Sequence, residues 1–501
     1  MSEAAIAATD AAFRVQGNAS SLHTSGRNAR RIVEESREQV AVAVGALPGE
    51  VVFTSGGTEA NNLAIKGLYW TRTAEDPRRT RIVTLPIEHH AVLDAVDWMG
   101  AHEGAIIDEV PVDANGVLDL DAYRTIVDRD PHTIALITIM WANNEVGTVQ
   151  PIDEIVAIAR VHGIPVHSDA VQAVGSLAVD FDSSGLAALT LSAHKFGGPI
   201  GTGALILGRE YKPTPISHGG GQERDVRSGT LAMPLIAGLG AGIAHAVSTR
   251  ASDMRRIAEM RDRLIAGVEA LDLGARLCGH RTNRLPGNAH FTFDGCEGDA
   301  LLMLLDANDV QVSTGSACTA GIPQPSHVLL SMGLDAATAR GALRFSLGRT
   351  SVAADVDALL AALPDALMQT HLSESPGEIA RVMELYPWAR DYTDVYDRFG
   401  LLGPRSLFAH GIHLSERECA RLSETGSTVI HCPTSNSFLG SGIMRMAHMA
   451  KAERPSWWRR LRFRLPAGRA GGAAPAVRSR AGTLWTWSWR IAVVLLVLYY
   501  P

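Results

Sequence analysis

One lysine in this sequence stands where an apolar segment runs into a glycine turn, a setting that suits covalent chemistry. Residues 191–199 read Leu-Ser-Ala-His-Lys-Phe-Gly-Gly-Pro, and the lysine is Lys195. A lysine buried among apolar neighbours is disfavoured as an ammonium ion, so its pKa falls and its neutral amine can attack an aldehyde. We therefore expect Lys195 to form an imine, with a surface lysine at the end of a strand as the simpler alternative.

Two further segments could hold a phosphate and a nitrogen-containing ring. An apolar run leads into Ser-Gly-Gly-Thr-Glu at 55–59, and a helical pattern follows. Backbone amides at a glycine-rich helix N-terminus bind phosphate, and the Thr58 hydroxyl can add a hydrogen bond. The second segment, 164–169, reads as a strand that ends at Asp169, with Gln172 three residues on. Ligands of open α/β sheets lie at the carboxyl ends of strands, so this carboxylate could pair with a protonated ring nitrogen, although helix capping is the commoner role.

These segments, in this order, closely resemble the cysteine desulfurases, pyridoxal-phosphate enzymes of the class V aminotransferase family. The resemblance extends over residues 17–360. The motifs that carry it are GNASSLH (17–23), TSGGTEANN (54–62), EHHAVL (88–93), NNEVG (143–147), DAVQ (169–172), HK (194–195), GGGQE (219–223), RSGT (227–230), STGSACT (313–319), PSHVL (325–329) and RFSLG (344–348). It implies an α/β protein, a fold-type I pyridoxal-phosphate transferase with a large domain on a mainly parallel sheet and a small α+β domain.

The resemblance also implies a role for each matching residue. Lys195 would hold the cofactor covalently and later move protons on the substrate carbon. The other cofactor contacts that it implies are Gly57, Thr58, Ser192 and His194 at the phosphate, His89 stacked on the ring as a catalytic residue, Asp169 at the ring nitrogen and Gln172 at the ring hydroxyl. Asn144, beside the cofactor, and Arg344 would hold the substrate carboxylate, which suits a guanidinium with paired donors. Thr230 would reach the phosphate of the neighbouring subunit's cofactor, which implies a homodimer.

Cys318 is the cysteine that we assign to catalysis. The sequence has five cysteines in 501 residues, which gives no disulfide framework, and Cys278 and Cys296 read as small buried apolar residues. Cys318 lies instead in a stretch of small residues, 314–323, that suits a mobile loop. A thiolate there could take the γ-sulfur of L-cysteine, become a persulfide and deliver the sulfur. We expect L-alanine as the other product and an iron–sulfur scaffold or a similar protein as the acceptor.

The desulfurase pattern stops near Leu363, and a second resemblance follows without a linker. Residues 368–442 resemble the guanine deaminases of the amidohydrolase superfamily, through QTHLSE (369–374), DYTDVY (391–396), FAHGIH (408–413) and HCPTSN (431–436). This implies that His371 and His410 end two barrel strands as metal ligands. The His-x-His pair of the family's first strand and its late Asp are missing from the sequence. A catalytic zinc needs about three protein ligands, so we interpret His371, His410 and His413 as relics, with no metal site; weak adventitious binding is the alternative.

We expect four parts along the chain. They are an N-terminal helix with the large cofactor-binding domain (1–234), the small domain with the catalytic cysteine (235–365), an incomplete (β/α) barrel fragment (366–442) and an irregular tail (443–501). The tail is basic and rich in tryptophan, and its last apolar run, 491–500, is far shorter than the roughly 20 residues that span a bilayer. We interpret the tail as disordered, with binding to an anionic membrane surface as the less favoured alternative.

The bulk composition fits a cytoplasmic enzyme. A net charge of −7 with 46% hydrophobic residues describes a soluble chain with an ample core. An excess of positive over negative residues is concentrated in the tail, without a recognition motif, so we expect no nucleic-acid partner. The N-terminus shows no signal peptide, and a reducing compartment suits a working thiol. The family's usual opening segment, of the form Tyr-Leu-Asp-x-x-Ala-Thr-Thr-Pro, is not found, so an open substrate pocket or a weakened fold is expected.

We predict a cysteine desulfurase that passes sulfur from L-cysteine through Cys318. Three alternatives stay open. A purine deaminase would show metal and guanine turnover, and an inactive fusion product would show no activity. A different substrate, such as selenocysteine, would leave lyase activity in a Cys318→Ala variant. The deaminase-like segment also suggests another acceptor of the sulfur, a molybdenum hydroxylase.

Overall fold

The computed structural model describes residues 1–306, 308–315, 324–363, 368–403, 406–430 and 442. They belong to two compact units. The first contains the described residues of Met1–Leu302, Asp309–Ala317 and Gln324–Ala361, and the second those of Met303–Asn308 and Ala362–Pro501. Cys318, the HCPTSN motif and the tail 443–501 lie outside the described residues. The predicted boundaries at 235, 366 and 443 stay predictions.

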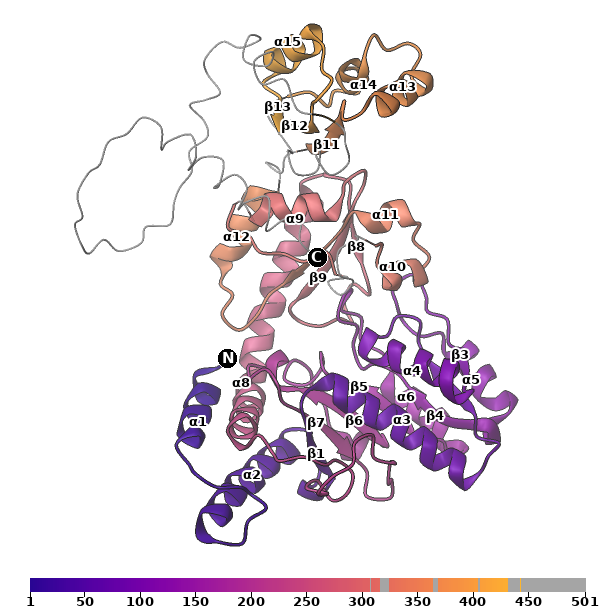
Figure 1. The fold of residues 1–501 in the computed structure, drawn as a ribbon, viewed down its shortest axis with the longest axis vertical. Helices are drawn as coiled ribbons and strands as arrows, with labels where there is room; N and C mark the ends of the chain where they lie inside the picture. The colour runs from indigo at the N-terminus through magenta and orange to yellow at the C-terminus, as the bar shows by residue number, and fades with distance from the viewer. Residues whose placement is uncertain (307, 316–323, 364–367, 404–405, 431–441, 443–501) are drawn as a thin grey trace, which may run out of the picture. The chain divides into compact units, whose positions relative to one another are not determined.

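A seven-stranded sheet forms the centre of the first unit (Figure 1). Its strands are β1 (Val51–Thr54), β2 (Arg81–Thr84), β3 (Ile106–Glu109), β4 (Ile134–Thr138), β5 (Val166–Asp169), β6 (Ala188–Ser192) and β7 (Gly203–Leu207), in the order β1-β7-β6-β5-β4-β2-β3. Strand β7 is antiparallel to both neighbours, whereas all the other pairs are parallel. The predicted mainly parallel sheet is confirmed. Because β1 and β6 both oppose β7, β1, β2, β4, β5 and β6 present their carboxyl ends at one edge.

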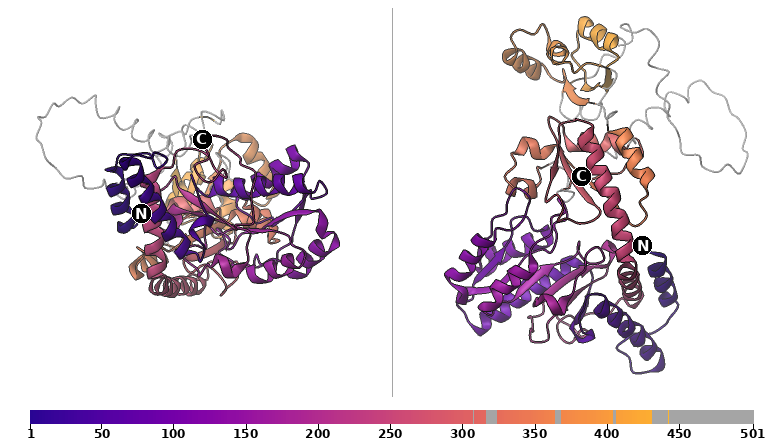
Figure 2. Two further views of the ribbon diagram at one scale, coloured as in Figure 1. Left: turned by 90° about the horizontal axis from the view of Figure 1, so that it is seen from below. Right: turned by 180° about the vertical axis from the view of Figure 1, so that it is seen from behind.

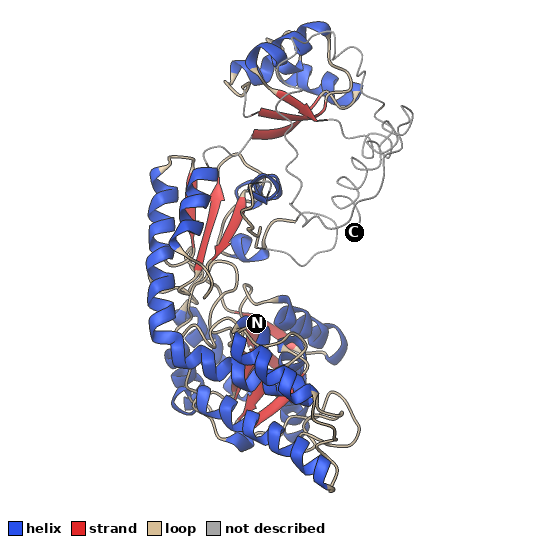
Figure 3. Cartoon of the chain, turned by 90° about the vertical axis from the view of Figure 1, so that its left-hand side faces the viewer, coloured by secondary structure: helices blue, strands red, loops and turns tan. Residues whose placement is uncertain are grey.

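Helices cover both faces of this sheet (Figure 3). They are α2 (Thr24–Ala43), α3 (Gly57–Glu75), α4 (His90–Glu103), α5 (Leu120–Arg129), α6 (Ile152–Val161) and α7 (Phe181–Ser184), with short 3-10 turns η1 (Pro48–Glu50), η2 (Pro131–Thr133) and η3 (Ala193–Lys195). Neighbouring strand residues enter different apolar clusters: Val52 packs with Leu63 of α3, while Phe53 packs with Val40 of α2. This alternation is why strands β1, β2, β4, β5, β6 and β7 are buried along their whole length.

Two N-terminal helices pack along one long helix (Figures 1 and 2). Helices α1 (Glu3–Phe13) and α2 lie against α8 (Met233–Ala270). The contact is close because α8 carries glycines: a Cβ atom on Gly240 would lie 2.9 Å from Cα of Ser36. The N-terminal helix expected from the sequence corresponds to α1.

The rest of the first unit is a small α+β layer. Its antiparallel sheet has the order β10-β9-β8, from β8 (Ala275–Cys278), β9 (Asn288–Phe293) and β10 (Ala342–Ser346). The helices near it in sequence are α9 (Gly298–Asp306), α10 (His327–Ser331), α11 (Ala336–Arg340) and α12 (Ala353–Ala362). Cys278 is buried as expected, but Cys296 is half-buried because it lies in the turn after β9.

The second unit contains three parallel strands. They are β11 (Met368–Leu372), β12 (Ser406–His410) and β13 (Thr428–Ile430), in chain order, with α13 (Pro376–Leu385), α14 (Tyr392–Arg398) and α15 (Glu416–Thr425) between them. Leu372, Phe408 and Leu422 lie in its apolar core. The alternation of parallel strands and helices agrees with the predicted (β/α) fragment. In neither unit does any helix of the described residues have the length and hydropathy needed to cross a membrane.

Candidate functional site

Five of the predicted site residues meet at one edge of the large sheet because five strands end there. Gly57 begins α3 after β1, His89 caps the N-terminus of α4 after β2, and Asn144 follows β4. Asp169 is the last residue of β5, and Lys195 lies in η3 directly after β6. Residues far apart in the sequence are thus brought to the carboxyl edge, where open α/β sheets bind ligands.

Asp169 is the buried anion of this edge. Its side chain is 7% exposed, its Oδ2 accepts a hydrogen bond from Nδ2 of Asn61 at 2.7 Å, and its Oδ1 accepts one from the amide of Val171 at 2.9 Å. Burial raises the pKa of Asp169, and these hydrogen bonds and the charges of His89 and Lys195 oppose the rise. A carboxylate so placed can bind a protonated ring nitrogen without competition from bulk water.

His89 and Lys195 lie within electrostatic reach of Asp169. Nδ1 of His89 accepts a hydrogen bond from the amide of Ala91 at 3.0 Å, which fixes the half-buried ring. Burial lowers the pKa of His89, as does the Lys195 charge, whereas Asp169 opposes the fall. Lys195 itself is exposed, which corrects the expectation of a buried amine. The reason is that β6 ends at Ser192 and the lysine follows in a turn outside the apolar strand.

The N-terminus of α3 adjoins these residues at the same edge of the sheet. A Cβ atom on Gly57 would lie 2.9 Å from Cγ2 of Val171 and 3.6 Å from Cβ of Ser192, so the glycine is required for this close approach. Oγ of Ser192 shares a hydrogen bond of 3.0 Å with Nδ1 of His194, and Thr58 is exposed. Partial burial lowers the pKa of His194, and the Lys195 charge lowers it further. Amides at a helix start and two hydroxyls form a favourable setting for an anion.

Asn144 and Arg344 are joined directly. Nη1 of Arg344, on β10, donates a hydrogen bond of 2.9 Å to the backbone oxygen of Asn144. Both residues are half-buried, as is Gln172, which follows Asp169 in the chain. Thr230 is exposed. Cys318 cannot be placed, since it lies outside the described residues.

Sequence analysis assigned no role to three residues that hold this site together. Asn61 supports Asp169, and Glu59 accepts hydrogen bonds from the amide of Ser55 at 2.6 Å and from Nε of Arg227 at 2.8 Å. The Glu59–Arg227 pair ties the segment that leads to Thr230 to the first turn of α3. The role of Asn61 could have been predicted from its spacing, because it lies one helical turn after Gly57, on the face of α3 that points to the sheet.

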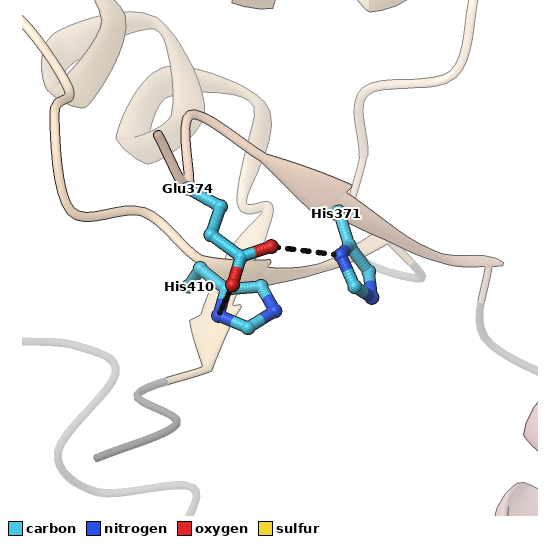
Figure 4. Close-up of side chains that lie close together, drawn as sticks. All are labelled: His371, Glu374 and His410. Atoms are coloured by element: carbon cyan, nitrogen blue, oxygen red, sulfur yellow. Dashed lines mark hydrogen bonds and ion pairs between the residues drawn. The ribbon is translucent and has the colours of Figure 1, made fainter. Parts of the chain in front are cut away.

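A separate polar cluster lies in the second unit (Figure 4). Oε2 of Glu374 lies 3.3 Å from Nδ1 of His371, and Oε1 lies 3.4 Å from Nδ1 of His410. The three potential ligand atoms lie within 4.8 Å of one another. The sequence resemblance pairs the two histidines as metal ligands but gives no role to Glu374, although Glu374 stands in the same QTHLSE motif as His371. His413 is exposed, and the interpretation of these histidines as relics stays a prediction.

Comparison with known proteins identifies the first unit. Residues 2–359 match the family model described as aminotransferase class-V. An IscS-like cysteine desulfurase of Mycobacterium tuberculosis is 55% identical over 368 residues, which cover 73% of this chain and 93% of that protein. The chain belongs to the cysteine desulfurases of this family. A cysteine desulfurase IscS of Dictyoglomus turgidum is 42% identical, with coverage of 68% and 85%.

Solved structures of cysteine desulfurase relatives share its fold. A NifS-like protein superposes with a TM-score of 0.67 at 33% identity, over 72% of this chain and 94% of that chain. SspA in complex with cysteine gives a TM-score of 0.60 at 32% identity, over 70% and 97%. Residues 338–453 match the amidohydrolase family model, which supports the predicted fusion to an amidohydrolase-like segment. The predicted fold-type I architecture is confirmed.

Proposed function

We propose that this desulfurase relative converts L-cysteine to L-alanine with pyridoxal phosphate, leaving the sulfur on Cys318. The observation that carries the proposal is that His89, Asp169 and Lys195, from the ends of β2, β5 and β6, come together at the carboxyl edge of the sheet. The similarity to cysteine desulfurases, over most of the chain, supports the same reaction.

The described residues fit pyridoxal phosphate. Asp169 is a buried carboxylate with two donors already in place, so it can take the ring nitrogen as a third partner. Burial lowers the pKa of His89, which favours its uncharged form, and its half-buried imidazole can stack on a ring. The start of α3, with Gly57, Thr58, Ser192 and His194, fits the phosphate. When bound, the cofactor supplies an electron sink next to the substrate's α-carbon.

The protein's own residues would then position the substrate and move its protons. Arg344, held by the backbone oxygen of Asn144, would bind the carboxylate of L-cysteine together with the Asn144 side chain. Nζ of Lys195 would take the α-proton and later return a proton to the product carbon. The nearby positive charge of Lys195 also favours the ionised form of Asp169.

Sulfur transfer would proceed through the Cys318 thiolate. Its Sγ attacks the γ-sulfur of the substrate, so that a sulfur–sulfur bond forms and the substrate's carbon–sulfur bond breaks. The substrate carbon keeps the electron pair and gains a proton, which gives L-alanine and a persulfide on Cys318. A thiol acceptor or reductant then removes the outer sulfur. We further propose an iron–sulfur scaffold or a similar acceptor, a homodimer and a cytoplasmic location.

A direct test is sulfide release from L-cysteine by the purified full-length chain with pyridoxal phosphate and a thiol reductant. We expect Cys318→Ala to lose sulfide release by at least about a hundredfold, because the nucleophile is gone, while the cofactor spectrum still responds to L-cysteine. Cys296→Ala is the matched control, since it removes another cysteine, which is free and half-buried. It should retain wild-type activity.

Other outcomes of the sulfide-release test would favour the alternative functions. No sulfide from the wild-type chain would favour an inactive fusion product. Lyase activity that survives in Cys318→Ala would favour another substrate, such as selenocysteine. The cluster of His371, Glu374 and His410 is the observation on which a deaminase would rest, and it would predict bound metal and guanine turnover.

A further inference from the structure

We propose that Glu145 is a positioning residue that holds both ends of the segment carrying Cys318, so that the thiol meets substrate bound at Arg344. The inference rests on the proposed function and adds a residue to which neither sequence motif nor family resemblance gave a role. Its basis is that Oε2 of Glu145 accepts a hydrogen bond from Ser326, which follows that segment, and lies close to Gly315, which precedes it.

The downstream contact is a hydrogen bond. Oγ of Ser326 donates to Oε2 of Glu145 at 2.5 Å, and both side chains are buried. A hydroxyl that donates to a carboxylate at this separation lies at the short, strong end of the range. The same Oγ accepts a hydrogen bond of 3.3 Å from the amide of Leu329 and so caps α10. Ser326 is therefore fixed by its carboxylate partner and by its own helix.

Upstream of the segment, Gly315 lies close to the same oxygen, with no room for a side chain between them. A Cβ atom on Gly315 would lie 3.0 Å from Oε2 of Glu145 and 3.2 Å from Nε2 of His290. Two residues earlier, the amide of Ser313 donates to the oxygen of Arg344 at 3.2 Å, and the amide of Arg344 donates back at 2.6 Å. The chain that enters the cysteine segment is thus paired to the substrate-binding arginine.

Glu145 is itself held rigidly. Its side chain is 3% exposed, its amide donates to Oδ1 of Asn143 at 2.8 Å, and its carbonyl accepts from Nδ2 of Asn288 at 2.8 Å. The preceding carbonyl, that of Asn144, receives Nη1 of Arg344. The short stretch of chain after β4 therefore acts in two ways. The backbone of Asn144 orders Arg344, and the side chain of Glu145 orders the segment that carries Cys318.

His290 adds a second buried group at this point. It is 0% exposed, and neither ring nitrogen has a hydrogen-bond partner among the described residues. It lies opposite Arg344 in the register of β9 and β10. Burial, with the charges of Arg344 and Arg284, lowers the pKa of His290 to about 3. The hydrogen bond from Ser326 is the contact through which the Glu145 carboxylate acts.

The test compares three full-length variants with the wild-type enzyme: Glu145→Gln, Ser326→Ala and the two combined. L-Cysteine binding is followed by cofactor absorbance, and the persulfide on Cys318 by mass spectrometry after rapid mixing. We expect each single variant to slow persulfide formation at least about tenfold, since a misplaced nucleophile loses much of its advantage. The apparent affinity for L-cysteine should stay within about twofold, because the carboxylate contacts remain.

The combined variant and a helix-cap control separate positioning from general damage. Both substitutions break one hydrogen bond, so the combined variant should be no slower than the slower single variant. Asp335→Ala removes the cap of the neighbouring short helix α11 without contact to Glu145, and it should form persulfide at the wild-type rate. Wild-type persulfide rates in both single variants, or equal slowing in Asp335→Ala, would overturn the inference. A wild-type enzyme that forms no persulfide would instead overturn the proposed function, and this inference with it.

Discussion

At the scale of single residues, the burial of Asp169 affects the pH range over which the site can bind the cofactor. Burial raises its pKa, so it takes up a proton at a higher pH than an ordinary aspartate. A protonated Asp169 can no longer pair with a protonated ring nitrogen. Cofactor binding should therefore be complete above this raised pKa and should weaken as the pH falls through it. Asn61 lowers the pKa through its hydrogen bond and so extends the range towards acid.

We predict that Asn61→Leu makes cofactor retention more sensitive to acid. The variant removes the donor to Oδ2 of Asp169, which raises the pKa of that carboxyl further, so pyridoxal phosphate should be lost at a higher pH than from the wild-type protein. Retained cofactor is measured by absorbance after dialysis at a series of pH values that starts at neutral pH and falls towards the ordinary range of aspartate. Asn62→Leu is the control, because Asn62 donates to the carbonyl of Thr58 instead. Identical retention curves for the two variants would contradict the prediction.

At the scale of elements, much of the site could be predicted because each polar motif follows an apolar strand. Apolar runs predict the strands that end before Gly57 and at Asp169, and the sheet brings these strand ends to one edge. Exposure was harder to predict: Lys195 follows a wholly buried strand yet lies in an exposed turn. Contacts across the sequence, such as Glu145 with Ser326, leave no periodic signal, so they could not be predicted.

The capping of α15 gives a prediction for the second unit alone. The buried Glu418 accepts hydrogen bonds from the amide and hydroxyl of Thr393 at 3.2 and 3.1 Å and from the amide and hydroxyl of Ser415, both at 2.8 Å. Glu418→Ala leaves these donors unpaired and should destabilise this unit by about 2 kcal/mol. Calorimetry of the full chain should show a lower melting transition for this unit, with unchanged sulfide release.

The control for this prediction lies on the same helix. Glu416 is exposed in the first turn of α15, and Glu416→Ala should change the free energy of unfolding by less than about 0.5 kcal/mol. A loss of sulfide release in Glu418→Ala would show that the desulfurase unit depends on the second unit. That outcome would contradict the expectation that Glu418 stabilises the second unit alone.

At the scale of the whole molecule, the proposed homodimer predicts that each active site is built from two chains. Lys195 would act in its own subunit, whereas the exposed Thr230 would serve the neighbour's phosphate. The Glu59–Arg227 ion pair, 2.8 Å long, ties the segment before Thr230 to the helix that starts at Gly57. An exposed threonine on a segment anchored in this way is well placed to act outside its own subunit.

Complementation between Lys195→Ala and Thr230→Ala tests whether Thr230 acts in the neighbouring subunit. Lys195→Ala should abolish sulfide release, and Thr230→Ala should lower it at limiting pyridoxal phosphate. When both variants are co-expressed with different affinity tags, the purified mixed dimer has one site with both mutations and one site with wild-type Lys195 and Thr230. Its sulfide release should therefore exceed the mean of the two parent variants. If Thr230 served its own subunit, no mixed dimer could contain an intact site, and activity would not rise above that mean.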